Sequence, residues 1–180
     1  MVGIEMLLPV AADDPELVAD ISALVNRAYE VAEEGLWHGG VARTTLPETY
    51  DAITAGEVVV ARDDGRLVGS IRTRQLDSET GWFGVLAVDQ TQGRRGIGGR
   101  LVAFAESRAM LAGASRMQLE LLVPGQAHEH TDRLATWYGR LGYQETERRD
   151  LADVEPSAVS FLAIPCDVAV MRKQLAAPVG

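Results

Sequence analysis

One stretch constrains the fold more than any other. Residues 85–101 run from an apolar segment, through a loop of glycine and arginine, directly into an amphipathic segment. This order predicts a strand, a loop and a helix, and glycine lets the loop backbone turn tightly and approach a ligand closely. The unpaired N–H groups at the start of the helix, from Ile97 onward, and the helix dipole favour an anion there. The stretch therefore predicts an anion-binding site.

The arginines of this loop narrow the kind of anion. Arg94, Arg95 and Arg100 bring positive charge to a chain whose formal net charge is −9. Fixed backbone donors combined with two or three guanidinium groups suit a pyrophosphate better than a carboxylate. An ordinary glycine-rich turn between a strand and a helix is the alternative that requires no ligand.

Two common phosphate-binding motifs do not fit the loop. A Walker loop needs Lys-Ser or Lys-Thr after its last glycine, whereas Gly99 and Arg100 follow Gly98 here. A dinucleotide fingerprint that began at Gly96 would need a third glycine where the chain has Leu101. The loop therefore indicates another pyrophosphate ligand.

Composition sets bounds on size, location and partners. At 180 residues the chain is expected to form one domain, residues 1–180, with a substantial core. The net charge of −9 argues against a nucleic-acid partner. Cys166 is the single cysteine, so an intrachain disulfide is excluded. The sequence shows no signal-peptide pattern and no apolar run of membrane-spanning length, so we expect a cytoplasmic protein that does not bind a membrane.

Apolar periodicity and turn signals predict an α/β chain with about seven strands and four helices. The predicted strands are residues 4–10, 57–62, 67–76, 82–88, 116–123, 143–149 and 168–173. The predicted helices begin near Pro15 and end near residue 34, and then cover residues 45–55, 98–112 and 131–141. Residues 151–165 are expected to be irregular.

Two motifs in this order resemble those of the GNAT superfamily of N-acetyltransferases. Residues 93–98 resemble the signature Q/R-x-x-G-x-G/A, with Gly93 at the Gln/Arg position, and residues 135–143 resemble the block A-x-x-[FL]-Y-x-x-x-G-[FY]. The resemblance implies a strongly twisted mixed sheet with helices on both faces. It also implies that the strands at residues 82–88 and 116–123 separate to admit an acyl-CoA.

The same resemblance implies acetyl-CoA as cosubstrate, with its pyrophosphate on the glycine loop and a backbone N–H near Ala87 or Val88 facing the thioester oxygen. Thr131 stands where the family often contacts the pantetheine arm, or it merely caps the helix. The residues assigned to acetyl-CoA are Leu86, Ala87, Val88, Gly93, Arg94, Arg95, Gly96, Ile97, Gly98, Gly99 and Thr131.

Tyr138 is the candidate general acid, because the family places the motif tyrosine beside the CoA sulfur and a phenol is neutral at pH 7. The alternative is a packed aromatic residue. Glu120 is the candidate general base, because it is an acid in an apolar strand, and the alternative is that it faces solvent or pairs with an arginine. Other candidates for that role are Glu33, Glu34, His38, Glu79 or a chain of waters.

The acceptor is expected to bind beside the two N-terminal helices and their loop. Arg43 could mark a carboxylate or phosphate on the acceptor, or it could be a surface arginine. The other loop candidates are Trp37, His38, Thr44 and Thr45. His128 and His130 are expected to lie in a surface loop rather than to bind a metal, because no third ligand type is near.

The chain is therefore predicted to transfer an acetyl group from acetyl-CoA to a primary amine of a small molecule or peptide, directly in a ternary complex and without a metal. A non-catalytic acyl-CoA-binding sensor is the alternative. A homodimer is also expected, through an exposed final strand at residues 168–173.

Overall fold

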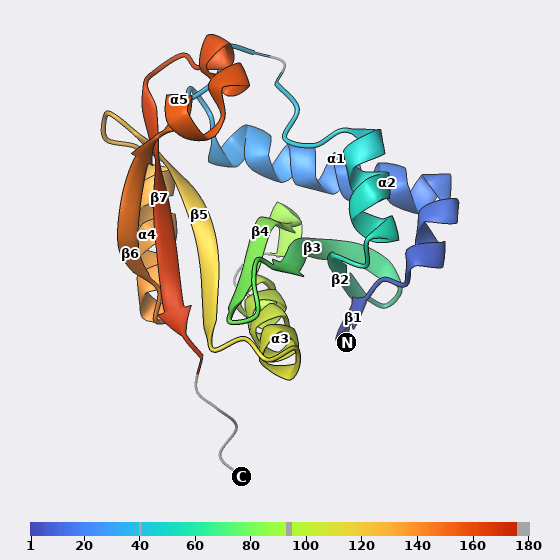
Figure 1. The fold of residues 1–180 in the computed structure, drawn as a ribbon. Coiled ribbons are helices and arrows are strands. Elements are labelled where there is room, and N and C mark those ends of the chain that lie inside the picture. Colours follow the sequence, from blue (N-terminus) through green and yellow to red (C-terminus); the bar gives the residue numbers. More distant parts are fainter. Residues whose placement is uncertain (40, 93–94, 176–180) are drawn as a thin grey trace.

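The computed structural model describes residues 1–39, 41–92 and 95–175, and it is built on one seven-stranded sheet (Figure 1). The strands are β1 (Val2–Met6), β2 (Val58–Asp63), β3 (Arg66–Gln75), β4 (Thr80–Val88), β5 (Arg116–Pro124), β6 (Gln144–Asp150) and β7 (Cys166–Gln174). The α-helices are α1 (Pro15–Ala32), α2 (Leu46–Thr54), α3 (Ile97–Leu111), α4 (Glu129–Arg140) and α5 (Leu151–Val154). Short 3₁₀ helices cover Pro9–Asp13, Gln90–Gln92 and Pro156–Phe161.

The sheet is mixed, with the strand order β1-β2-β3-β4-β5-β7-β6. Strands β2, β3 and β4 form an antiparallel meander, and β4 and β5 are parallel. Figure 1 shows a twisted sheet with α3 and α4 on one face and α1 and α2 on the other. This arrangement confirms the predicted fold class.

Each face of the sheet is covered by a separate set of apolar side chains. On one face, Leu101 and Val102 of α3 pack with Met117 and Leu119 of β5. On the other face, α1 and α2 cover the β1–β4 half of the sheet, where Ile53 is fully buried. Helices α1 and α2 do not cover the other half of this face, where Glu120 of β5 is exposed and Gln118 is buried.

The predicted helix starts are confirmed by their caps. The Asp14 carboxylate accepts from the N–H groups of Glu16 and Leu17, at 3.0 and 3.1 Å, and so caps α1. Thr45 and Glu48 form a reciprocal capping box at the start of α2. Both caps satisfy N–H groups that the first turn of a helix leaves unpaired.

The first strand is shorter than predicted. It ends at Met6 instead of residue 10, and the chain then forms the 3₁₀ helix Pro9–Asp13. Pro9 has no N–H to donate to a ladder, so it ends the strand. Leu8 and Val10 are 68% exposed, so their apolar character was a misleading strand signal.

Residues 151–165 are more regular than predicted, because they contain α5 and a 3₁₀ helix. The Asp150 carboxylate accepts from the Ala152 N–H at 2.8 Å and begins α5. A single helical turn is too short to show apolar periodicity, so the sequence pattern gave no signal of it.

The predicted exposed final strand is wrong. Strand β7 lies between β5 and β6, and Val170 in its centre is fully buried. The edge strand at this end of the sheet is β6, whose residues are all exposed and include the ion pairs Arg148–Glu145 and Arg149–Glu147. A charged edge of this kind discourages pairing with another sheet. A homodimer stays a prediction, but it cannot use β7 as an edge.

No helix in the part of the chain that the structure describes is long and apolar enough to cross a membrane.

Candidate active site

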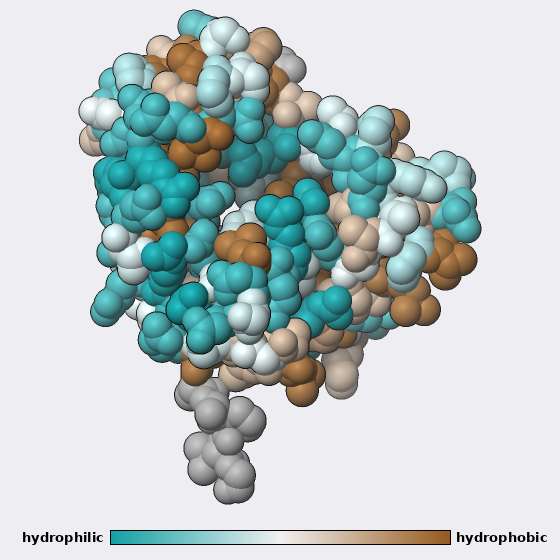
Figure 2. All heavy atoms as spheres, in the orientation of Figure 1, coloured by the Kyte–Doolittle hydropathy of each residue, from teal (hydrophilic) through white to brown (hydrophobic). Residues whose placement is uncertain are grey.

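The candidate site lies where the sheet opens between two parallel strands. Strands β4 and β5 are paired only at one end, where Thr80, Gly81 and Trp82 face residues 116–118. Beyond these pairs the strands separate, as the sequence predicts, and a cleft of about 350 Å³ occupies the opening. Helices α1 and α4 supply its walls, and Figure 2 shows a hollow in the surface between the two halves of the sheet.

A bulge in β4 shapes this opening. Arg72 faces Gly84 and Ser70 faces Ala87, so Val85 and Leu86 together oppose a single residue of β3. Val85 has a φ of +51°, which is unusual for a β-branched residue and is the kind of strain found at functional sites. Leu86 lines the cleft, and Ala87 is only 1% exposed. The bulge therefore turns the Leu86 backbone toward the cleft.

The glycine loop forms a second cleft of about 270 Å³ at the start of α3. Gly96 precedes the helix with a φ of +70°, a conformation that glycine adopts without strain. The Arg100 N–H bonds to the Gly96 carbonyl, so the first helical N–H groups, at Ile97, Gly98 and Gly99, lack partners within the helix. Gly96, Ile97, Gly98 and Gly99 all line this cleft.

The two clefts meet. Val88, Gln90, Gly98 and Trp137 line both of them. A Cβ atom on Gly98 would lie 3.6 Å from the Trp137 ring and 3.8 Å from Val88, so only a small side chain leaves the junction open. An elongated ligand can therefore extend from the start of α3 to the opening between β4 and β5.

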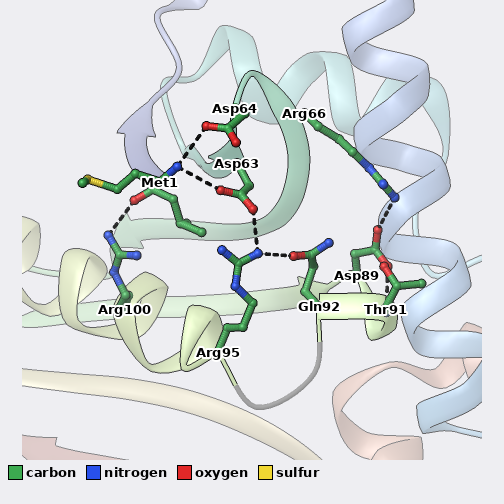
Figure 3. A network of polar contacts seen from close by, with 10 residues as sticks. Met1, Asp63, Asp64, Arg66, Asp89, Thr91, Gln92, Arg95 and Arg100 are labelled. Atoms are coloured by element: carbon green, nitrogen blue, oxygen red, sulfur yellow. Dashed lines mark hydrogen bonds and ion pairs between the residues drawn. The ribbon is translucent and has the colours of Figure 1, made fainter.

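The loop arginines contribute less to this site than the sequence suggested. The Arg95 guanidinium donates to Asp63 at 2.6 Å and to Gln92 at 2.5 Å, and Arg100 donates to the Val2 carbonyl at 2.8 Å (Figure 3). The Arg95 guanidinium, with the N-terminal amine, holds the pKa of Asp63 below its usual range. These contacts leave the backbone N–H groups as the main anion donors of the described loop. Gly93 and Arg94 lie outside the described residues.

Tyr138 of α4 points into the first cleft from an aromatic cluster. It is 7% exposed, and its ring centre lies 4.8 Å from that of Trp137 and 6.0 Å from that of Phe83. Burial raises the pKa of Tyr138, and the nearby Tyr29 raises it further, so the phenol keeps its proton at neutral pH. Its hydroxyl has no hydrogen-bond partner among the described residues. The neighbouring Tyr143, in contrast, donates to Glu106 at 2.7 Å and is part of the core.

Glu120 extends from β5 into the same cleft. Its neighbours Leu119 and Leu121 are buried on the α3 face, whereas Glu120 is exposed on the opposite face. The carboxylate makes no ion pair with a residue that the structure describes. Although its neighbours in the strand are apolar, Glu120 is not buried, and its side chain lines the cleft.

The other candidate bases divide into two groups. Glu33 lines the cleft and accepts from Trp37 Nε1 at 2.6 Å. Glu79 lies near Arg116, at 3.4 Å, at the paired end of β4 and β5 and away from the opening. Glu34 and His38 do not line the cleft.

The histidine pair at the start of α4 does not form the predicted loop. Helix α4 begins at Glu129, and His128 caps it by accepting from the Thr131 N–H at 3.3 Å. His128, not Thr131, is therefore the cap, and Thr131, whose hydroxyl lies 3.0 Å from His128 Nδ1, lines the cleft. Among the described residues no group of three His, Cys, Asp or Glu side chains could hold a metal.

His130 also lines the cleft, although no sequence pattern selects it as a cleft residue. Burial lowers the pKa of His130, and the nearby Arg133 and His128 lower it further, so the imidazole is neutral at pH 7 and can accept a proton. Tyr29 is a second cleft residue that sequence reasoning missed. Burial raises the pKa of Tyr29, although the Arg43 guanidinium and the Leu86 backbone N–H act in the opposite direction.

The loop between α1 and α2 sends one of the predicted acceptor residues into the cleft. Arg43 lies over the Tyr29 ring, 4.7 Å from its centre, and lines the cleft. Trp37 instead pairs with Leu162 and bonds to Glu33, and Thr45 caps α2. The Thr44 backbone is bound to Asn26.

Comparison with known proteins agrees with this architecture. Residues 54–145, just over half of the chain, match the family model described as an acetyltransferase (GNAT) domain. The chain therefore belongs to the GNAT family of acetyltransferases. The sequence has no match among curated proteins.

Several solved structures share the fold at low sequence identity. The structure of PaiA N-acetyltransferase from Thermoplasma acidophilum in complex with coenzyme A has a TM-score of 0.70 at 14% identity, over 97% of this chain and 99% of that one. Ard1 from Thermoplasma volcanium has a TM-score of 0.67 at 16% identity, over 97% of this chain and 98% of that one. The structure of YncA, a putative acetyltransferase from Salmonella typhimurium, with its cofactor acetyl-CoA has a TM-score of 0.64 at 16% identity, over 100% of this chain and 97% of that one.

Proposed function

We propose that this protein transfers an acetyl group from acetyl-CoA to a primary amine, directly and in a ternary complex. The observation that carries the proposal is the connection between the two clefts, one at an open helix N-terminus and one at an unpartnered phenol. Two of the similar structures hold coenzyme A or acetyl-CoA, which supports the same ligand here.

The described residues fit acetyl-CoA at both ends. The free N–H groups from Ile97 to Gly99 offer donors to a pyrophosphate, and the helix dipole adds to their effect. Gly98 keeps the passage to the opening free, because a Cβ there would already contact Trp137. The exposed edges of β4 and β5 beyond their last pair, with Leu86, Val88 and Thr131, would hold the pantetheine arm.

When bound, acetyl-CoA supplies an acetyl group activated as a thioester. The Leu86 N–H, at the bulge, faces the Tyr29 hydroxyl in the cleft, and it is the donor proposed to stabilise the developing negative oxygen, one or two residues earlier than the sequence suggested. The Tyr138 hydroxyl holds the proton for the departing sulfur, because burial keeps its pKa high. Glu120 is the proposed base for the acceptor ammonium, and Glu33 and His130 are the other proton acceptors that line the cleft.

Measuring transfer directly tests this proposal. The protein is incubated with acetyl-CoA and, one at a time, with polyamines, aminoglycosides, amino acids and peptides that have free N-termini or lysines. Released free thiol and acetylated product are followed together. Stoichiometric formation of both supports the proposal. Tight acetyl-CoA binding without product on any amine would instead indicate a sensor module.

A further inference from the structure

The charged side chains that line the cleft indicate which amines it can bind. Apart from the neutral His130, the charged side chains among its described lining residues are Glu33, Arg43 and Glu120. Two carboxylates and one guanidinium complement a molecule that carries one ammonium and one carboxylate. A phosphate dianion facing two carboxylates, with one guanidinium to offset it, would be repelled more strongly.

Arg43 is held in place to bind an anion. Its guanidinium stacks on the Tyr29 ring at 4.7 Å. The next residue, Thr44, has both backbone groups bound by the Asn26 amide, at 2.9 and 3.0 Å. Asn26 and Tyr29 are three residues apart in α1 and so lie on one face of the helix. One helix face therefore fixes both the backbone and the side chain of the 43–44 segment.

The guanidinium is also available. Arg43 forms no ion pair with a residue that the structure describes, whereas Arg62, Arg66, Arg72 and Arg95 each pair with a carboxylate. The Tyr29 hydroxyl also interacts with the guanidinium, and the N–H groups that it leaves unoccupied are available to a carboxylate. Ordering Arg43 in advance reduces the entropy lost on binding.

We infer that the acceptor is a small amine that carries a carboxylate, of the amino-acid class, with Arg43 binding the carboxylate and Glu33 and Glu120 facing the amine. This inference rests on the proposed function for its reaction, but the binding step can be measured without turnover. In this arrangement Tyr29 positions Arg43, and Glu120 is left to accept the proton that the ammonium loses.

The test compares each standard L-amino acid with its carboxamide, which keeps the amine and lacks the charge. Binding to the CoA-loaded protein is measured as a shift in melting temperature and then by calorimetry, because a ligand that binds only the folded state raises that temperature. Turnover is measured with the same compounds. The variants are Arg43→Gln and the matched control Arg27→Gln, an exposed arginine of α1 that does not line this cleft.

We expect at least one amino acid to bind, with its carboxamide about 10- to 100-fold weaker. Arg43→Gln should weaken binding of the amino acid by a similar factor and leave the affinities for the carboxamide and for acetyl-CoA unchanged. Arg27→Gln should bind all three as the wild type does. Equal binding of acids and carboxamides, no binding of any amino acid, or wild-type affinity in Arg43→Gln would overturn the inference. Binding that depends on Arg43 without acetyl transfer would uphold the ligand class and refute the proposed function.

Discussion

Asn26 binds Thr44 through both ends of its side-chain amide: Nδ2 donates to the Thr44 carbonyl at 2.9 Å, and the Thr44 N–H donates to Oδ1 at 3.0 Å. This pair joins α1 to the loop that carries Arg43. A helix residue with no proposed contact to a ligand thus holds the loop segment that carries Arg43.

Replacing Asn26 with alanine should separate positioning from chemistry. Losing two partly buried hydrogen bonds should lower the free energy of unfolding by about 1 to 2 kcal/mol. The KM for an amino-acid acceptor should rise by roughly 3- to 30-fold, with kcat nearly unchanged, because Arg43 loses its fixed position. Glu30→Ala, at an exposed position of the same helix, is the control. A stability loss with an unchanged KM would show that the contact is only structural.

Enlarging Gly98 should close the passage between the two clefts. The side chain of Gly98→Leu would extend toward Trp137 and Val88, which a Cβ alone would already approach to 3.6 and 3.8 Å. Acetyl-CoA affinity should fall by about 10-fold or more, as measured by calorimetry. Gly139→Leu is the matched control, because a Cβ at this α4 glycine meets nothing within 4 Å. Equal affinity in the two variants would contradict the placement of the ligand.

His130 predicts a pH dependence of stability. Burial lowers its pKa in the folded protein, so below the unfolded value of about 6.5 the unfolded chain binds a proton that the folded chain does not. The stability of the wild type should therefore fall as the pH is lowered through this window. His130→Gln should show a smaller fall. Melting temperatures at pH 7.5 and pH 5.5 measure the difference, and identical shifts would mean that His130 is not buried in the cleft as described.

The proposed base can be tested through the pH dependence of the rate. Glu120→Gln keeps the size of the side chain and removes its ability to accept a proton, so the acidic limb of the pH–rate profile should disappear while the basic limb stays. The control is Glu79→Gln, because Glu79 is near Arg116 and away from the opening. An acidic limb that survives in Glu120→Gln would transfer the role to Glu33, His130 or water.

The fold and the cleft at the start of α3 could be predicted because their signals are local. The glycines before Ile97, the caps at Asp14 and Thr45, and the apolar strands each act within a few residues along the chain. The opening between β4 and β5 also followed, since it comes with the family resemblance. The order of the last two strands did not follow, because the apolar content of β7 does not show which strand lies at the edge of the sheet.

The residues that surround Arg43 on the proposed acceptor side could not be predicted because they depend on long-range contacts. Tyr29 and Asn26 are ordinary residues of an amphipathic helix until the loop folds back on them. His130 lies in the first turn of α4, and only the packing of that helix against the opening brings it into the cleft. For Arg95 the reverse holds, because a loop arginine that suggested phosphate binding is paired with Asp63 on a distant strand.

The most direct test of the central claim is the rate of acetyl transfer by Tyr138→Phe, with Tyr50→Phe on the exposed surface of α2 as its control. The change removes one hydroxyl and keeps the ring that packs against Trp137 and Phe83. The account predicts unchanged acetyl-CoA affinity and a kcat about 10- to 1000-fold lower, because the general acid is lost, with Tyr50→Phe at the wild-type rate. A Tyr138→Phe enzyme that turns over as fast as the wild type would contradict it.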